Sequence, residues 1–326
     1  MSWLVTGGAG YIGAHIAWTL LEAGLDVVVL DDLSTGRQEF VPPGSAFVPA
    51  DIRDPAAVER AIRDHGVTGI IHAAGMKYAG LSVAQPLHAY GLNVTGTIAV
   101  LDAMARTGVD ALVFSSSCSV YGTPAADTVD ETTPLAPESP YARSKLAAEW
   151  VIRDAARAGA GSAAGALRHL SLRYFNVVGA AAPGVWDTSP HNLFPLVFEA
   201  LKRGEAPRIF GDDYPTPDGT CIRDYVHVAD IAEAHLAAAL ALADGRDLPD
   251  VINLGSGTGS SVRAIMRAVA DTTGIDLPPV VVPRRPGDPA RIVAGAGLAG
   301  EVLGWAPRRG LTEMVESGWA AHRGLA

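Results

Sequence analysis

Short apolar runs alternate with longer stretches of helical periodicity through the first half of the chain. Each run is almost continuously apolar, which is typical of parallel strands that are covered by helices on both faces. The predicted strands cover residues 3–6, 27–31, 46–50, 69–73, 111–115 and 170–174. This pattern predicts an α/β protein built on a doubly wound parallel sheet.

The predicted helices fill the intervals between these strands. The first covers residues 11–23, and the next begins with Asp54 as its N-cap followed by a proline. Another begins after Pro140. Alanine, glycine and serine then dominate residues 158–166, which predicts a flexible surface loop.

The regular alternation weakens in the second half of the chain. Proline and glycine interrupt residues 180–219 and 278–287. We therefore predict two domains, the larger covering residues 1–175 and completed by parts of 226–258. The smaller domain, covering residues 176–326, is expected to be α/β, discontinuous and substrate-binding.

The composition excludes several classes of function. The chain has 326 residues, 48% of them hydrophobic, so it can bury a large core. A net charge of −10 disfavours general nucleic-acid binding, which needs an excess of Lys and Arg. Two cysteines are too few for a disulfide framework, so we expect a cytoplasmic protein. We expect neither a signal peptide nor a membrane-spanning segment.

The first candidate site is the glycine-rich sequence at residues 7–13, which follows a predicted strand and opens a predicted helix. Such a turn lets a pyrophosphate approach the free amides at the helix N-terminus. Asp31, at the end of the second predicted strand, is placed to accept hydrogen bonds from an adenine-ribose hydroxyl. Asp31 and Asp32 would repel a 2′-phosphate, so NAD is favoured over NADP, and Arg37 is the one contrary feature. This order of elements favours a Rossmann-type dinucleotide site over a structural glycine turn.

The second candidate site is Tyr141 with Lys145. Residues four apart lie on one face of a helix, so the phenol and the ammonium can face the same ligand. A phenol with a pKa of about 10 is a poor base at neutral pH, and an adjacent positive charge stabilises the phenolate. Ser117 is the last of three serines after a predicted strand, where open α/β sheets bind ligands. Turn formation explains those serines equally well.

These motifs resemble those of extended short-chain dehydrogenases/reductases. Later segments are similar to UDP-galactose 4-epimerases: RYFNVVGA at 173–180, IFGDDYPT at 209–216, RDYVHV at 223–228 and RRPGD at 284–288. The resemblance covers almost the whole chain, and its motifs are specific in order and spacing.

The resemblance implies catalytic, cofactor and substrate residues. Tyr141 would be the base, Lys145 would hold the nicotinamide ribose, and Ser117 would hydrogen-bond the sugar hydroxyl. Cofactor contacts are implied for Gly7, Gly10, Tyr11, Ile12, Gly13, Asp31, Asp51, Ile52, Ala73, Ala74, Lys77, Asn93, Tyr141, Lys145 and Tyr174. Substrate contacts are implied for Ser117, Asn176, Asn192, Leu193, Phe210, Arg223, Tyr225, Arg285 and Asp288.

The activity implied by the resemblance is reversible, NAD-dependent epimerisation of UDP-glucose and UDP-galactose at C4 through a 4-keto sugar. Three alternatives stay open: a 4-epimerase of another UDP-sugar (an N-acetylhexosamine or a pentose), a sugar-nucleotide dehydratase, and an NAD-dependent dehydrogenase. Cys118 and Ser119 stand where a dehydratase needs carboxylic acids. A binding protein without catalysis would not need Tyr141 and Lys145.

The resemblance also implies a homodimer, joined through the helices near residues 97–106 and 141–157. Ile292 falls where the resembling epimerases carry a residue whose bulk limits space beside the C2 substituent of the sugar. Isoleucine is intermediate in size, so we expect UDP-glucose and UDP-galactose to be preferred and N-acetyl sugars to be turned over weakly.

Other polar residues are interpreted as structural. The nine histidines show no metal-ligand spacing, so we predict no metal site and structural roles for His72 and His227. Cys118 is interpreted as a small buried thiol, because no histidine is placed locally to activate it. Three acidic residues are expected in a solvated loop: Asp127, Asp130 and Glu131.

Overall fold

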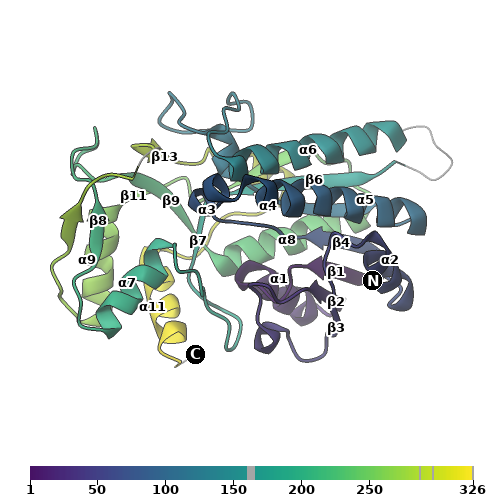
Figure 1. Ribbon diagram of the computed structural model, residues 1–326, viewed down its shortest axis with the longest axis horizontal. Helices are drawn as coiled ribbons and strands as arrows, with labels where there is room; N and C mark the ends of the chain where they lie inside the picture. Colours follow the sequence, from purple (N-terminus) through teal and green to yellow (C-terminus); the bar gives the residue numbers. More distant parts are fainter. Residues whose placement is uncertain (160–165, 286–287, 296, 325–326) are drawn as a thin grey trace.

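The computed structural model describes residues 1–159, 166–285, 288–295 and 297–324 (Figure 1). Seven strands, all paired in parallel, form the large sheet. In spatial order they are β3 (Ala46–Pro49), β2 (Asp26–Asp31), β1 (Ser2–Thr6), β4 (Gly69–His72), β5 (Ala111–Ser117), β6 (Arg168–Tyr174) and β10 (Val251–Leu254). The predicted Rossmann-type α/β fold is confirmed.

Helices cover both faces of this sheet, so its strands are buried on both sides. On one face lie α1 (Tyr11–Glu22), α8 (Val228–Ala243) and α10 (Gly297–Leu303), and on the other α2 (Pro55–Asp64), α5 (Gly96–Thr107) and α6 (Pro140–Gly159). The first face is filled by a cluster that includes Ile16, Leu20 and Ile231. A second cluster, with Val58 and Ile152 among its members, fills the other face.

Local sequence determines where the helices begin and end. α1 stops before Gly24, which takes the left-handed φ of 78°. α2 begins as predicted, because the Asp54 carboxylate accepts the amides of Ala56 and Ala57. α6 runs through Gly159, so residues 158 and 159 of the predicted loop at 158–166 are helical, and residues 160–165 lie outside the described residues.

The second half of the chain adds two small sheets, seen to the left of the large sheet in Figure 1. In the first, β9 (Ile222–His227) pairs with β7 (Asn176–Val178), β11 (Gly259–Ser261) and β13 (Arg291–Ile292). In the second, β8 (Arg208–Phe210) pairs with β12 (Val280–Val282), which lies within the proline- and glycine-interrupted stretch. The surrounding helices are α7 (Leu193–Lys202), α9 (Val262–Thr273) and α11 (Leu311–His322).

Short helical segments complete the connections. They are η1 (Gln38–Phe40), α3 (Ala79–Ala84), α4 (Pro86–Tyr90), the π-helical turn η2 (Gly91–Thr95) and η3 (Cys118–Tyr121). Within the part of the chain that the structure describes, no helix combines the length and the apolar character needed to cross a membrane.

Candidate active site

The glycine turn joins β1 to α1 near the middle of the sheet. β1 lies between β2 and β4, which is the switch point where open parallel sheets bind ligands. Gly7 has φ 69°, and a Cβ there would lie 2.7 Å from the backbone of Ala74. A Cβ on Gly13 would lie 2.1 Å from the carbonyl oxygen of Gly7. Side chains are therefore excluded from both positions, and the turn presents only backbone to a ligand.

The N-terminus of α1 is not capped by a side chain. Gly10 is its N-cap. The amides of Tyr11 and Ile12 belong to the first turn, where backbone N–H groups have no hydrogen-bond acceptor within the helix. The phenol of Tyr11 donates to the carbonyl oxygen of Gly179 at 2.6 Å, so this side chain packs internally. The backbone of the turn is thus the part that fits a pyrophosphate.

Asp31 is fixed beside this turn at the end of β2. Its carboxylate accepts the amides of Ala9 at 3.0 Å and Leu33 at 2.8 Å. Burial raises the pKa of Asp31, and these two hydrogen bonds act against that effect. The guanidinium of Arg37 lies 5.2 Å from the Trp186 ring centroid and contacts Glu39, so it is already engaged. The glycine turn, the uncapped helix and the fixed carboxylate fit NAD.

The structure brings Ser117, Tyr141 and Lys145 together at the carboxyl end of β5. The serines belong to the strand itself, which was predicted to end at 115 and continues to Ser117. Tyr141 and Lys145 lie on the buried face of α6. The phenol is hydrogen-bonded to Ser117, and Nζ of Lys145 donates to the carbonyl oxygen of Ser115 at 2.9 Å.

Burial dominates the acid–base properties of this group. It raises the pKa of Tyr141 to about 12, and the hydrogen bond with Ser117 offsets part of the rise. It lowers the pKa of Lys145 to about 8, against the raising effect of Glu149. The expected lowering of the phenol pKa by the ammonium is therefore not found here: burial has the largest effect on this pKa, and Lys145 is not among the groups that shift it.

The segment that follows β4 lies between the glycine turn and α6. Ala73 and Ala74 are half-buried, and Asn93 holds the next residues in place. Its Oδ1 accepts the amide of Met76 at 2.8 Å, and its Nδ2 donates to the Met76 carbonyl at 3.1 Å and to Ser144 Oγ at 2.8 Å. Sequence reasoning gave Asn93 a cofactor contact and missed this bridging role.

Lys77 lies near Asp187, which in turn contacts a residue just before α7. Nζ of Lys77 lies 3.9 Å from Oδ1 of Asp187. The other carboxylate oxygen of Asp187 accepts Nδ2 of Asn192 at 2.7 Å. The sequence gave no signal for Asp187, because it lies in an irregular segment without a recognisable motif. Leu193 follows as the first residue of α7 and is half-buried.

Four of the predicted substrate residues gather around β8 and β9. Arg223 is buried on β9, rather than solvated as an isolated arginine would be, and it forms an ion pair with Asp288. The Arg285 guanidinium lies 3.9 Å from the centroid of the Phe210 ring. A cavity of about 420 Å³ opens here, with Tyr214, Arg285 and Asp288 in its lining. An arginine over an aromatic ring, with a second arginine held nearby by Asp288, suits a nucleoside diphosphate.

The remaining predicted residues occupy mixed environments. Tyr225 is buried on β9 and lies opposite the exposed Asn176 of β7. Tyr174 ends β6 opposite Ser117, within the large sheet. The carboxylate of Asp51 is bound by Arg53, which lowers its pKa, and Ile52 is buried.

Several polar residues make structural contacts. His72 bonds Thr6 Oγ1 at 2.7 Å, and burial lowers its pKa to about 3. His227 accepts the amide of Ala229 at the start of α8. Burial raises the pKa of Cys118 to about 12, so this thiol is a poor nucleophile.

The acidic residues after η3 differ in their exposure. Asp127 and Asp130 are exposed, whereas the half-buried Glu131 accepts the amide of Asn253 at 2.6 Å, which corrects the expected solvated loop. Across the described ranges, no cluster of three or more metal-binding side chains is found.

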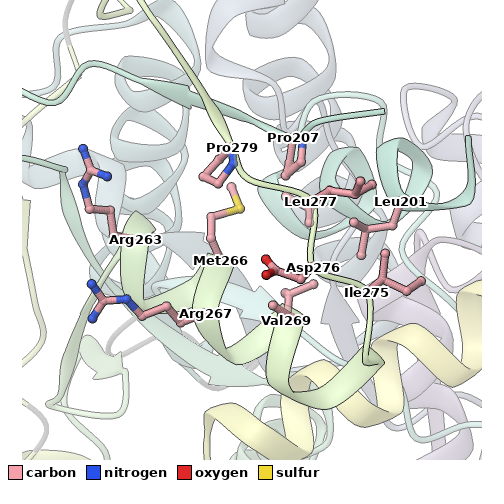
Figure 2. A pocket seen from close by; sticks show the side chains of 12 residues that line it. Leu201, Pro207, Arg263, Met266, Arg267, Val269, Ile275, Asp276, Leu277 and Pro279 are labelled. Carbon is pink, nitrogen blue, oxygen red and sulfur yellow. The ribbon is translucent and has the colours of Figure 1, made fainter. Parts of the chain in front are cut away.

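A second cavity opens between α7, α9 and residues 275–279 (Figure 2). Its lining is mainly apolar, with Leu201 and Met266 among the side chains. The guanidinium groups of Arg263 and Arg267 point away from it. None of the predicted catalytic, cofactor or substrate residues lines this cavity, so it is separate from the candidate active site.

The fold and this site together define a dinucleotide-dependent enzyme of the short-chain dehydrogenase/reductase type. The chain belongs to the NAD dependent epimerase/dehydratase family, whose model matches residues 3–255.

Similar proteins cover nearly the whole chain. The UDP-glucose 4-epimerase of Streptomyces lividans is 44% identical, over 98% of this chain and 95% of that enzyme. The enzyme of the same name from Azospirillum brasilense is 42% identical, over 99% of this chain and 92% of that enzyme. The crystal structure of UDP-glucose-4-epimerase from Stenotrophomonas maltophila, with bound NAD and formylated UDP-arabinopyranose, superposes with a TM-score of 0.93 at 39% identity, covering 99% of this chain and 98% of that one.

Proposed function

We propose that this protein interconverts UDP-glucose and UDP-galactose by inverting the sugar at C4 with bound NAD. The observation that carries the proposal is the grouping of Ser117, Tyr141 and Lys145 at one end of β5, beside the glycine turn. The buried Arg223 supports a diphosphate anchor on the substrate side. The activity is also that of the named relatives described above.

Each residue of the site has a distinct part in this reaction. Tyr141, once ionised, accepts the proton of the C4 hydroxyl, and Ser117 orients that hydroxyl through its own hydrogen bond to the phenol. Lys145 supplies positive charge beside the reacting oxygen. NAD would be held by the glycine turn and Asp31, and it would supply reversible hydride transfer at C4. Arg223 and Arg285 hold the diphosphate while the sugar turns over.

A coupled assay on UDP-galactose tests the proposal. The expected result is formation of UDP-glucose without stoichiometric release of NADH. A dehydrogenase would release NADH in proportion to turnover, and a dehydratase would eliminate water from the sugar. If no UDP-glucose forms and NADH or a dehydrated sugar nucleotide forms instead, the proposed activity is wrong.

NAD, and not NADP, is expected to co-purify with the protein. Asp31 is fixed by two amides at the end of β2, where a 2′-phosphate would meet its carboxylate. The measurement is acid release of the bound nucleotide followed by chromatography against both standards. NADP as the only nucleotide recovered would refute this assignment.

We further propose a homodimer joined through α5 and α6, in the cytoplasm. Ile98 and Trp150 lie on these helices and are each 48% exposed, and Leu87 of α4 is 86% exposed. Exposed large apolar side chains on neighbouring helices favour a protein contact. The free Cys118 and Cys221 suit a reducing compartment. Light scattering should report the mass of two chains, and Trp150→Glu should reduce it to one.

A further inference from the structure

A buried ion pair lies directly behind the candidate catalytic residues. Nη2 and Nε of Arg173 donate to the two carboxylate oxygens of Glu149 at 2.6 and 2.9 Å. The side chains are 4% and 9% exposed, respectively. Ser116 donates its hydroxyl to the same carboxylate. This bidentate pair therefore joins α6 to both β5 and β6.

The register of the sheet explains why these side chains meet. Ser116 lies opposite Arg173 in the β5–β6 ladder, so both side chains project to the same face of the sheet. Glu149 reaches that face from α6, one turn after Lys145 and two turns after Tyr141. Ser117 is the next residue along β5. The pair thus contacts the two elements that carry all three candidate catalytic side chains.

The network continues beyond the ion pair. Nη1 of Arg173 donates to the phenol oxygen of Tyr121 at 3.0 Å, and Tyr121 donates to Oδ1 of Asn253 at 2.7 Å. Tyr121 belongs to η3, the turn that directly follows Ser117, and Asn253 lies on β10. The turn is consequently tied to the sheet on the side away from the solvent.

We propose that Glu149 and Arg173 are positioning residues: together they fix the carboxyl end of β5 against α6, and so fix Ser117 relative to Tyr141 and Lys145. This inference rests on the proposed function. Replacement of a buried ion pair by apolar residues is often neutral or stabilising, so stability alone does not explain why charges occupy this position. Misplacement of reacting groups by about 1 Å can cost about a hundredfold in rate.

The pair also sets the charge around Lys145. Glu149 raises the pKa of Lys145 from its own helix. From β4, His72 is neutral at physiological pH, because burial lowers its pKa to about 3. In the resting protein Tyr141 on α6 and Tyr174 on β6 are protonated there, because burial raises the pKa of both. Tyr141 must lose that proton before it can act as the base.

Among these groups facing the ammonium, Glu149 is therefore the one that bears a negative charge. Arg173, on β6, bears a positive charge on the far side of that carboxylate. Removal of the Glu149 charge leaves the guanidinium without its counter-ion and lowers the pKa of Lys145. As the pH is raised, Lys145 then loses its proton earlier, so the activity that needs protonated Lys145 is lost at a lower pH than in the wild type.

The test is Glu149→Gln, which keeps the size and an acceptor for Ser116 but removes the charge. We expect kcat on UDP-galactose to fall about tenfold or more, with KM changed less, and the alkaline limb of the kcat profile to move to lower pH. The matched control is Asp230→Asn, because Asp230 is a buried carboxylate on α8 that is paired with Arg309 and bonds none of the candidate catalytic residues. That control should lower the melting temperature without moving the pH profile.

The double variant Glu149→Met with Arg173→Met guards against a folding defect, because it leaves no unpaired buried charge. It should melt near the wild-type temperature and still show the lowered kcat and the shifted alkaline limb. If both variants keep the kcat and the pH profile of the wild type, the positioning role is overturned and the proposed function is not affected. A wild-type protein without epimerase activity would overturn the proposed function, and this inference with it.

Discussion

Tyr141→Phe is expected to leave the fold intact and to lower turnover of UDP-galactose by at least about a hundredfold. General-base catalysis typically contributes about a hundredfold to ten-thousandfold, and phenylalanine has no group that can take the C4 proton. The fold should persist, because the ring stays in place and only the hydrogen bond to Ser117 is lost. A neutral hydrogen bond of this kind contributes about 1 kcal/mol.

The measurement is single-turnover kinetics on UDP-galactose, together with the melting temperature and the content of bound NAD. Tyr90→Phe is a suitable control, because this phenol is 37% exposed on α4 and belongs to no proposed catalytic contact. It should retain wild-type turnover. Near-normal turnover in Tyr141→Phe would remove this phenol from the mechanism.

Much of the fold followed from local patterns. The strands that became β1 and β2 are nearly continuous apolar runs, and the stop at Gly24 and the cap at Asp54 are local signals. β5 was predicted two residues too short, because serines at its end are as common in turns as in strands. β12 was not predicted, because prolines flank it and its pairing with β8 depends on residues far away in the chain.

The properties of the site that depend on burial and on contacts between distant residues could not be predicted from the sequence. The spacing of Tyr141 and Lys145 put them on one helix face, but the rise of the phenol pKa to about 12 depends on the surrounding structure. Asp187 and Glu149 gave no recognisable motif, because their partners come from other elements. The resemblance supplied the nucleotide residues, whereas the structure supplied the contacts between them.

Ile292 is expected to limit which sugars fit, and its contacts locate it between the two halves of the site. It lies opposite Arg223 in the β9–β13 register, so one neighbour is the proposed diphosphate anchor. Its other neighbours include Val120 and Leu146, which closely follow Ser117 and Lys145 in the chain. A side chain that is 5% exposed in such a cluster cannot easily move aside for an N-acetyl group.

The series Ile292→Val, Ile292→Ala and Ile292→Gly should raise kcat/KM for UDP-N-acetylgalactosamine relative to UDP-galactose in that order, by about tenfold to a hundredfold at glycine. Hydrophobic pockets discriminate added or missing groups by about this much. The stability should fall along the series, because truncating a buried aliphatic side chain costs about 2–5 kcal/mol.

Val293→Ala separates specificity from this loss of stability. Val293 is equally buried and is adjacent in sequence, and its side chain lies near Gly259 and outside the cluster around Ile292. It should lower the melting temperature and leave the sugar ratio unchanged. If wild-type protein already prefers the acetylated sugar, or if the ratio does not rise as residue 292 becomes smaller, a different side chain forms the wall beside C2.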